Sequence, residues 1–432
     1  MPKIERLTGR EILDSRGRPT VLATCTLEGG FTASASVPSG ASTGAAEALE
    51  LRDKDPKRYH GLGCRQAAAN VTGELQNRLA GRSFADQSEL DRTMIALDGT
   101  PTKSRVGANA ILAVSVAFAR ANAFLRGVPL YQHFSEIMGA PANTLPRLTI
   151  NLFSGGKHAG EQVSVQDVLI TPIASRTIDE VLVSAFNVYQ AAADLILSRY
   201  GMRLLTADEG GLAPPCKSAE EMLALAIESI ERAGYVPGKD IFLGIDVAST
   251  HFYENGQYHK DGKVLDSAGM IKAISQWLDQ YPILSIEDGL AEDDWENWPK
   301  LRKAIAGRAL TLGDDLLCTN PGRIERAIEV NACDALLLKV NQIGTLTEAR
   351  QAYQQARAAG WAVTLSVRSG ETEDNWAADL AVGWSADQFK NGSIRQSERL
   401  AKYNRLLEIE ENTHWPLARW PKASIVVETN AE

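Results

Sequence analysis

Three acidic residues and one lysine each end a short apolar run in the second half of the chain. The runs FLGID, ILSIE, LTLGD and ALLLK end at Asp246, Glu287, Asp314 and Lys339. Three carboxylates that meet need a cation between them, and a site with oxygen ligands alone favours Mg2+ or Mn2+ over zinc. A nearby divalent cation would favour the neutral amine of Lys339, so we expect this lysine to have a lowered pKa and to act as a base.

Each of these residues also has an ordinary interpretation. An acid after a strand can cap the next helix, and the lysine can form a salt bridge with one of the acids. The segment TADEGG places Glu209 before two glycines, which suits a general acid in a loop, although DEGG is also an ordinary turn. A base and an acid across a magnesium site are what proton abstraction next to a carboxylate and loss of a leaving group require. The sequence therefore predicts a β-elimination site.

The recurrence of the apolar runs predicts the elements that position these residues. A fifth run, AVTLSV, ends at Val367, and the five ends are 41, 27, 25 and 28 residues apart. All spacings but the first fit one strand, one helix and two loops. In a (β/α)8 barrel the carboxyl ends of the strands converge on one mouth, whereas an open doubly wound sheet would spread them along a line. We expect a barrel, with its strands before residue 240 not assigned.

The first third of the chain has a different pattern. The strand-like segments PTVLATCTLEGG and FTASASVPSG precede the helical segments NVTGELQNRLAG and GANAILAVSVAFARANAFL, which predicts a small α+β domain. Prolines and glycines concentrate between residues 127 and 147, as is typical of a connection between domains. We therefore expect an N-terminal domain over residues 1–140 and a barrel domain over residues 141–432.

The composition is that of a soluble globular enzyme. The formal net charge of -9 is spread over the chain, without the basic stripe that nucleic acid requires. Five widely spaced cysteines without a CxxC pair predict neither a disulfide framework nor a zinc knuckle. The start MPKIERLTGR lacks the apolar core of a signal peptide, and the run ANAILAVSVAFA is too short to span a bilayer. We expect a cytoplasmic protein without a membrane anchor.

The longest motifs resemble those of the enolases (phosphopyruvate hydratases). They are REILDSRGRPTV, VPSGASTGAAEALELRD, SIEDGLAEDDW, LLLKVNQIGTLTEA and RSGETEDNWAADLAVG, and the resemblance runs over nearly the whole chain. It implies an N-terminal α+β domain followed by a modified (β/α)8 TIM-type barrel, in a homodimer or a larger homo-oligomer with DSRG near the subunit contact. The implied reaction is the dehydration of 2-phosphoglycerate to phosphoenolpyruvate with two Mg2+ per active site.

The resemblance also implies a role for each matching position. Lys339 matches the base, Glu209 the acid, and Asp167 a carboxylate that works beside the acid. The expected Mg2+ ligands are Asp246, Glu287 and Asp314 for the tightly held ion and Ser42 for the second one. The expected substrate contacts are Arg368 and Ser369 for the phosphate, Lys390 for the carboxylate, and the mobile-loop His158, which closes over the phosphate.

The chain departs from the family pattern at the site. It reads SVRSGETED where enolases read SHRSGETED, so Val367 replaces a histidine, and QDV for QEF places Asp167 where glutamate is usual. Ser154 stands for asparagine in SGG, and Arg18 stands for another asparagine. Aspartate is shorter by about 1.5 Å, and valine removes a hydrogen-bonding group. Losing such a group commonly costs on the order of 100-fold in rate.

Three hypotheses follow. The first is a slower but true enolase. The second is a paralogue that dehydrates or hydrates a phosphonate or phosphinate analogue, as the enolase-like carboxyphosphonoenolpyruvate synthase does, with Asp167 and Val367 shaping the substrate pocket. The third is a non-catalytic enolase-fold binding protein, which the retained metal ligands and base disfavour.

Overall fold

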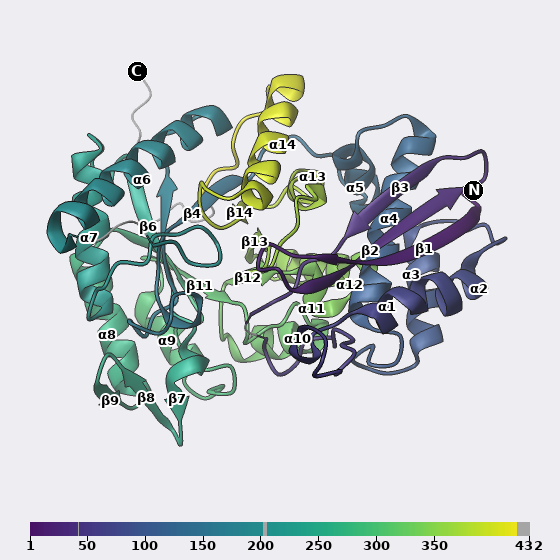
Figure 1. Ribbon diagram of the computed structural model, residues 1–432. Helices are drawn as coiled ribbons and strands as arrows, with labels where there is room; N and C mark the ends of the chain where they lie inside the picture. Colours follow the sequence, from purple (N-terminus) through teal and green to yellow (C-terminus); the bar gives the residue numbers. More distant parts are fainter. Residues whose placement is uncertain (42, 202–204, 421–432) are drawn as a thin grey trace.

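The computed structural model describes residues 1–41, 43–201 and 205–420. Its described part contains a three-stranded sheet with helices, which lies beside a closed barrel of eight strands (Figure 1). The expected fold class, a small α+β domain followed by a modified TIM-type barrel, is confirmed. The boundary at residue 140 stays a prediction; it falls between α5 (Leu130–Met138) and the first barrel strand, β4 (Arg147–Ser154).

The small domain is built on an antiparallel sheet. Strand β2 (Pro19–Leu27) pairs with both β1 (Ile4–Leu13) and β3 (Thr32–Ser36). Alternate residues of β2 are buried because one face of the sheet packs on α4 (Ala108–Arg126). The predicted strands at β2 and β3 and the predicted helix at α4 are confirmed, whereas β1 was not assigned from sequence because few of its side chains are buried. The other helices described in this domain are α1 (Arg65–Asn70), α2 (Gln76–Leu79), α3 (Gln87–Asp98) and α5, with a short 3-10 helix at Tyr59–Gly61 and a π-helix at Val71–Leu75.

The barrel strands follow the order β10-β11-β12-β13-β14-β4-β5-β6. The five apolar runs predicted as strands are β6 (Ile241–Asp246), β10 (Ile283–Glu287), β11 (Leu310–Gly313), β12 (Ala335–Leu338) and β13 (Ala362–Ser366). The other two are β5 (Asp167–Pro172) and β14 (Gln388–Lys390). All described side chains of these strands are buried, so the interior of the barrel is a packed core.

The spacing predicts a barrel of parallel strands, but one strand of the barrel is reversed. Strand β5 runs antiparallel to both β4 and β6. The reason is the connection: only residues 155–166 join β4 to β5, without the long crossover helix that a parallel pair requires. Consequently the first residue of β5, Asp167, lies opposite the last residues of its neighbours, Ser154 and Asp246.

Helices cover the outside of the barrel. They are α6 (Ile178–Tyr200), α7 (Ala219–Arg232), α8 (Ser267–Gln280), α9 (Trp298–Ile305), α10 (Pro321–Val330), α11 (Val340–Ile343), α12 (Leu346–Ala358), α13 (Trp376–Gly383) and α14 (Ser397–Thr413). Three of them begin with an N-cap side chain: Thr177, Ser218 and Thr345 accept hydrogen bonds from the backbone N–H of a glutamate three residues later. A small antiparallel sheet, β7 (Tyr253–Glu254), β8 (Gln257–Lys260) and β9 (Lys263–Leu265), projects from the barrel (Figure 1).

Among the described residues, two helices, α4 and α6, are long and apolar enough to cross a membrane by length and composition. The run predicted to be too short is therefore part of a longer helix. The most apolar window of α4 is 78% buried inside the protein and that of α6 is 50% buried. Their apolar faces pack on the small sheet and on the barrel, respectively, as in the core helices of a soluble protein.

The two domains meet along several described elements, among them α3 with α12 and α4 with α11. On one side α5 packs on α13, and the backbone N–H of Tyr131 donates to Asp379 Oδ1 at 3.1 Å. On the other side the loop after β3 reaches the barrel, where Ser39 and Gly370 exchange backbone hydrogen bonds of 2.8 and 3.0 Å. A Cβ at Gly370 would collide with Arg16 and Asp14, so glycine is required for this close approach. The small domain thereby covers part of the barrel's C-terminal end.

Candidate active site

The carboxyl ends of the barrel strands enclose a small cavity of about 20 Å³, which we call the mouth. It is lined by Ala41, His158, Gln166, Glu209, Asp246, Lys339, Ser366, Val367, Arg368, Ser369 and Lys390. Eight of the predicted site residues are therefore brought together. The other predicted residues, Asp167, Glu287 and Asp314, are buried next to it, and Ser42 lies outside the described residues.

Two of the predicted metal ligands, Asp246 and Glu287, form ion pairs with the same lysine, Lys390. Asp246 and Glu287 end neighbouring strands and lie opposite each other in the β6–β10 register. The ammonium of Lys390 donates to Asp246 Oδ2 at 2.8 Å and to Glu287 Oε2 at 2.7 Å. Burial and the charge of Asp246 raise the pKa of Glu287 well above its usual range. This pair of carboxylates therefore requires a positive charge, and its oxygens fit Mg2+.

The third predicted ligand is held by different partners. The carboxylate of Asp314 accepts from the ammonium of Lys339 and, at 2.8 Å, from Gln342 Nε2. Within the described residues, the groups whose potential ligand atoms lie within 4.8 Å of one another are His158 with Asp167 and Glu209, and Asp288 with Asp314 and Asp315. The predicted set of Asp246, Glu287 and Asp314 is not such a group among the described residues.

Lys339 lies where a base is expected but does not have the predicted pKa. It follows β12 directly, and its backbone N–H donates to Thr319 Oγ1 at 2.9 Å, which fixes the start of α11. Burial alone would lower its pKa, but the charge of Asp314 outweighs burial and raises it above the usual value. The expected lowering of the Lys339 pKa is therefore not found here, because the negative charge of Asp314 stabilises the protonated lysine.

Glu209 points into the mouth from the loop between α6 and α7. A turn holds this loop: the N–H of Gly210 donates to Ala207 O, and the N–H of Ser393 donates to Glu209 O at 2.9 Å. The residue is only 6% exposed, so the carboxyl is buried rather than presented on an open loop. Burial would raise its pKa, but the positive charges of His158, Arg399, Lys390 and Lys339 lower it.

The two residues predicted to contact phosphate, Arg368 and Ser369, are in contact with the loop that follows β3 in the small domain. Arg368 Nη1 and Nη2 donate to the carboxylate of Glu47 at 2.9 and 3.2 Å, and Nη1 also reaches Asn341 Oδ1 at 3.2 Å. Ser369 Oγ accepts from the backbone N–H of Ala41 at 2.8 Å and from Arg16 Nη1 at 3.2 Å. The anion-binding side of the mouth is therefore assembled from both domains.

Val367 presents apolar surface to the mouth. Its backbone N–H donates to Lys390 O at 3.1 Å, which continues the pairing of β13 with β14, and its side chain is 6% exposed and packs against the apolar core. No hydrogen bond to a substrate can come from this side chain.

His158 and Asp167 form a buried pair beside the mouth. His158 Nδ1 lies 3.1 Å from Asp167 Oδ2, and the Asp167 side chain is fully buried. Burial would lower the pKa of His158, but the charge of Asp167 and the hydrogen bond to it outweigh burial and raise this pKa to about 9. His158 lines the cavity, whereas Asp167 lies behind it.

Sequence reasoning missed four polar residues at the site. Gln166 Nε2 donates to Asp246 Oδ2 at 3.2 Å, and Gln342 binds Asp314. Asn341 and Glu47 both hold Arg368. The available signal was proximity in the chain: Gln166 precedes Asp167, and the polar pair in KVNQIG follows Lys339 by two and three residues. Nothing in the sequence places Glu47 near Arg368, because the two lie in different domains.

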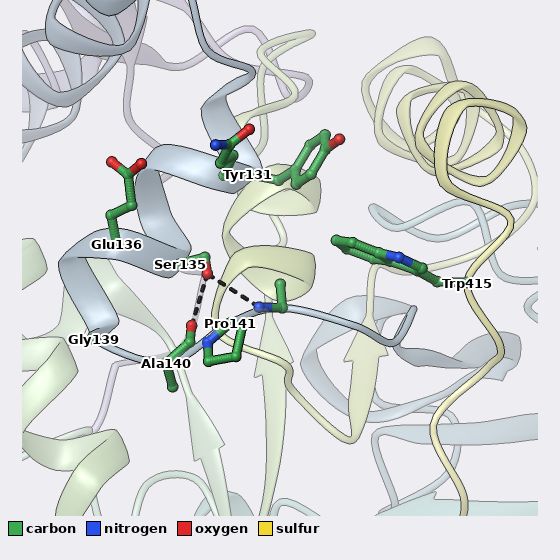
Figure 2. A pocket seen from close by; sticks show the side chains of 9 residues that line it. Tyr131, Ser135, Glu136, Gly139, Ala140, Pro141 and Trp415 are labelled. Atoms are coloured by element: carbon green, nitrogen blue, oxygen red, sulfur yellow. Dashed lines mark hydrogen bonds between the residues drawn. The ribbon is translucent and has the colours of Figure 1, made fainter.

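A larger cavity lies elsewhere. It has a volume of about 470 Å³ and opens between α5 and Trp415 (Figure 2). Ser135 Oγ donates to Ala140 O at 2.7 Å and accepts from Ala142 N at 3.1 Å, which fixes the segment between the domains along its edge (Figure 2). Its one acidic lining residue, Glu136, is paired with Arg126. Because no acid and base face each other there, we place the chemistry at the mouth.

Comparison with known families agrees with this location. Residues 4–134 match the family described as "Enolase, N-terminal domain", and residues 142–415 match "Enolase, C-terminal TIM barrel domain". The second match alone covers more than half of the chain and includes every predicted site residue except Ser42. The chain therefore belongs to the enolase family and is a lyase of the enolase superfamily.

Proposed function

We propose that the protein dehydrates 2-phosphoglycerate to phosphoenolpyruvate in a Mg2+-dependent reaction. One observation carries the proposal: Lys339 and Glu209, a base and an acid by chemical type, line the same small mouth as Asp246, Arg368 and Lys390. Groups suited to proton transfer, to metal binding and to contact with an anionic substrate thus share one cavity, which supports the proposal.

The carboxylates of Asp246, Glu287 and Asp314 are the groups that would hold Mg2+, which members of the family usually bind. When bound, Mg2+ supplies positive charge against the negative charge that develops on the substrate carboxylate. Lys390, which now neutralises Asp246 and Glu287, would then be available for the substrate carboxylate. A second Mg2+ with Ser42 as a ligand is part of the same proposal.

In this proposal the protein's own residues move two protons. The neutral Nζ of Lys339 takes the proton next to the substrate carboxylate, and the Glu209 carboxyl protonates the departing hydroxyl. As described above, Asp314 favours protonated Lys339, and the surrounding cations favour ionised Glu209. A metal ion bound to Asp314 would offset part of the negative charge of this carboxylate. Protonated Lys339 would then be less stabilised, so metal binding is expected to lower the pKa of this lysine.

A second candidate function rests on Val367. The apolar side chain at the mouth cannot replace a hydrogen-bonding or titrating histidine. We therefore propose, as the alternative, that the enzyme acts on a phosphonate or phosphinate analogue of 2-phosphoglycerate, for which the retained Arg368 and Lys390 still supply cationic contacts. A homodimer also stays a proposal, and light scattering coupled to gel filtration would measure it.

The test uses purified protein with Mg2+ and 2-phosphoglycerate, and it follows the ultraviolet absorbance of phosphoenolpyruvate. Formation of product that is lost in Lys339→Ala and in Glu209→Gln would support the main proposal, and no product from the wild type would contradict it. Turnover comparable with that of an ordinary enolase would contradict the alternative. If turnover is poor, we expect the double variant Asp167→Glu with Val367→His to raise it.

A further inference from the structure

Four polar side chains meet behind the mouth: Asn151 and Ser154 on β4, His158 on the following loop, and Asp167 at the start of β5. Ser154 and Asp167 lie directly opposite each other in the antiparallel β4–β5 register. The strand pairing itself therefore brings the serine hydroxyl to the carboxylate.

Both oxygens of Asp167 are used inside this group. Oδ1 accepts from Asn151 Nδ2 and from Ser154 Oγ, each at 2.7 Å, and Oδ2 lies 3.1 Å from His158 Nδ1. The side chain is fully buried and does not line the mouth. A carboxylate held in this way does not reach a substrate in the cavity, so its effect on the reaction must pass through a residue that does.

His158 is that residue. Its imidazole lines the mouth, and the bond from Nδ1 to Asp167 leaves Nε2 as the ring nitrogen available to a ligand. A carboxylate on one imidazole nitrogen fixes the orientation of the ring and the nitrogen that carries the proton. The loop that carries His158 is also tied to β5, since Gly155 N donates to Gln166 O at 2.7 Å.

The pair on β4 keeps the carboxylate in place. Asn151 Nδ2 also donates to Ser154 Oγ at 3.0 Å, so the amide, hydroxyl and carboxylate form one connected group. The loop of Glu209 closes against it at Gly211, where an added Cβ would lie 2.7 Å from Asn151 Oδ1 and 2.8 Å from Ser154 Oγ. No side chain can enter at residue 211 without displacing the group.

We propose that Asp167 is a positioning residue, held by Ser154 and Asn151, that orients His158 toward the anionic substrate. It takes no proton from the substrate in this assignment. The inference concerns the site of the proposed dehydratase and rests on that function only for its kinetic consequences. The geometric part, the contact of Asp167 with His158 Nδ1, belongs to the free protein.

The first test is therefore made without substrate. The chain has six histidines, so 15N-histidine labelling gives few signals, and His158 is assigned by the loss of its signal in His158→Gln. We expect a downfield Nδ1–H proton resonance from His158 that disappears in Asp167→Asn and shifts in Ser154→Ala. An unchanged His158 resonance in Asp167→Asn would overturn the proposal.

The second test separates positioning from proton transfer. Because outer-sphere partners of an active-site histidine commonly contribute about 10–100-fold to activity, we expect Asp167→Asn and Ser154→Ala to raise KM for 2-phosphoglycerate more than they lower kcat. A fall in kcat at unchanged KM would contradict positioning and would indicate proton transfer by Asp167. In His158→Gln the further change Ser154→Ala should have almost no effect, and an undiminished effect would also count against the proposal.

Asp91 offers a matched control. It is another fully buried carboxylate, which accepts from Gln87 Nε2 at 3.0 Å and from Thr347 N and Oγ1 at 2.9 and 2.6 Å, away from the mouth. Asp91→Asn should lower the melting temperature without moving the His158 resonance or KM. If the His158 resonance responds to Asp167→Asn as expected but the wild type forms no phosphoenolpyruvate, the positioning stands and the proposed function fails.

Discussion

Arg368 Nη1 lies 2.9 Å from Oε2 of Glu47, and this ion pair joins the barrel to the loop of the small domain. Both side chains are more than nine-tenths buried. Burial would lower the pKa of Arg368, but Glu47 outweighs it and raises the pKa further above its usual range, so the guanidinium is permanently charged. A residue expected to bind phosphate is therefore already bound to an internal carboxylate.

This pair predicts that Glu47 competes with anions. In Glu47→Gln the neutral amide no longer cancels the charge of Arg368, so we expect inorganic phosphate to bind more tightly, by on the order of tenfold. Isothermal titration calorimetry of the free protein measures this directly. Glu296→Gln, which changes an acid that is 87% exposed, should leave the affinity as it is. Weaker phosphate binding in Glu47→Gln would show that the loop contact matters more than the charge.

The pairing of Lys390 with Asp246 and Glu287 predicts a metal-dependent stability. A ligand that binds the folded state raises the melting temperature with its concentration, so we expect Mg2+ to stabilise the wild type. Asp246→Asn removes one of the carboxylates that would hold the ion and should abolish most of that shift. Differential scanning calorimetry with and without Mg2+ measures it, again with Glu296→Gln as the control. An equal Mg2+ shift in wild type and Asp246→Asn would place the ion elsewhere.

His158 predicts how anion affinity depends on pH. With its pKa raised to about 9 by Asp167, the imidazole stays positive through neutral pH and loses its charge as the pH rises through 9. Because the folded-state pKa lies above the ordinary value near 6.5, the pair also contributes stability that is present below pH 6.5 and is lost toward pH 9.

We therefore expect the affinity of the wild type for phosphate to fall between pH 8 and 10, by at most about tenfold per unit above the pKa. His158→Gln has no charge to lose and should show a flatter profile in calorimetric titrations over the same range. If phosphate affinity depended on pH in the same way in both proteins, the positive charge of His158 would not contribute to binding of the anion.

The part of the fold that sequence predicted is the part that repeats. Apolar runs ending in Glu287, Asp314, Lys339 and Val367 recur at spacings of 27, 25 and 28 residues, and that period is itself the signature of strand–helix units. Strand β5 could not be found in this way, because a reversed strand after a short loop breaks the period. The strand order and the closure of the barrel depend on pairings between residues far apart in the chain.

Within the site, residue types were predictable and their partners were not. Acids and a lysine at strand ends indicate a shared mouth, and the structure has Asp246 and Lys339 lining it, with Glu287 and Asp314 buried beside it. A salt bridge of Lys339 with one of the acids was the alternative that the sequence left open. Which acid it meets depends on side-chain geometry, so neither the pairing with Asp314 nor the resulting rise of the Lys339 pKa could be specified. Contacts between domains, such as Glu47 with Arg368, leave no local pattern in the sequence at all.

Replacing Val367 with histidine is expected to lower stability and to raise activity on 2-phosphoglycerate. Its side chain packs against the apolar core and is 6% exposed, so an imidazole at this position would have to leave water without an assured partner. We expect Val367→His to lose about 1–3 kcal/mol of unfolding free energy in urea titrations. At the same time it should raise turnover of 2-phosphoglycerate, because a hydrogen-bonding and titrating group returns to the mouth.

Val367→Thr is the matched variant for this prediction, since it keeps the shape of valine and replaces one methyl group with a hydroxyl. It should lose less stability than Val367→His and should not raise turnover to the same extent. If both variants leave turnover unchanged while Val367→His alone is destabilised, the valine serves packing only. The reason for an altered substrate would then have to lie in the group formed by Ser154, Asp167 and His158.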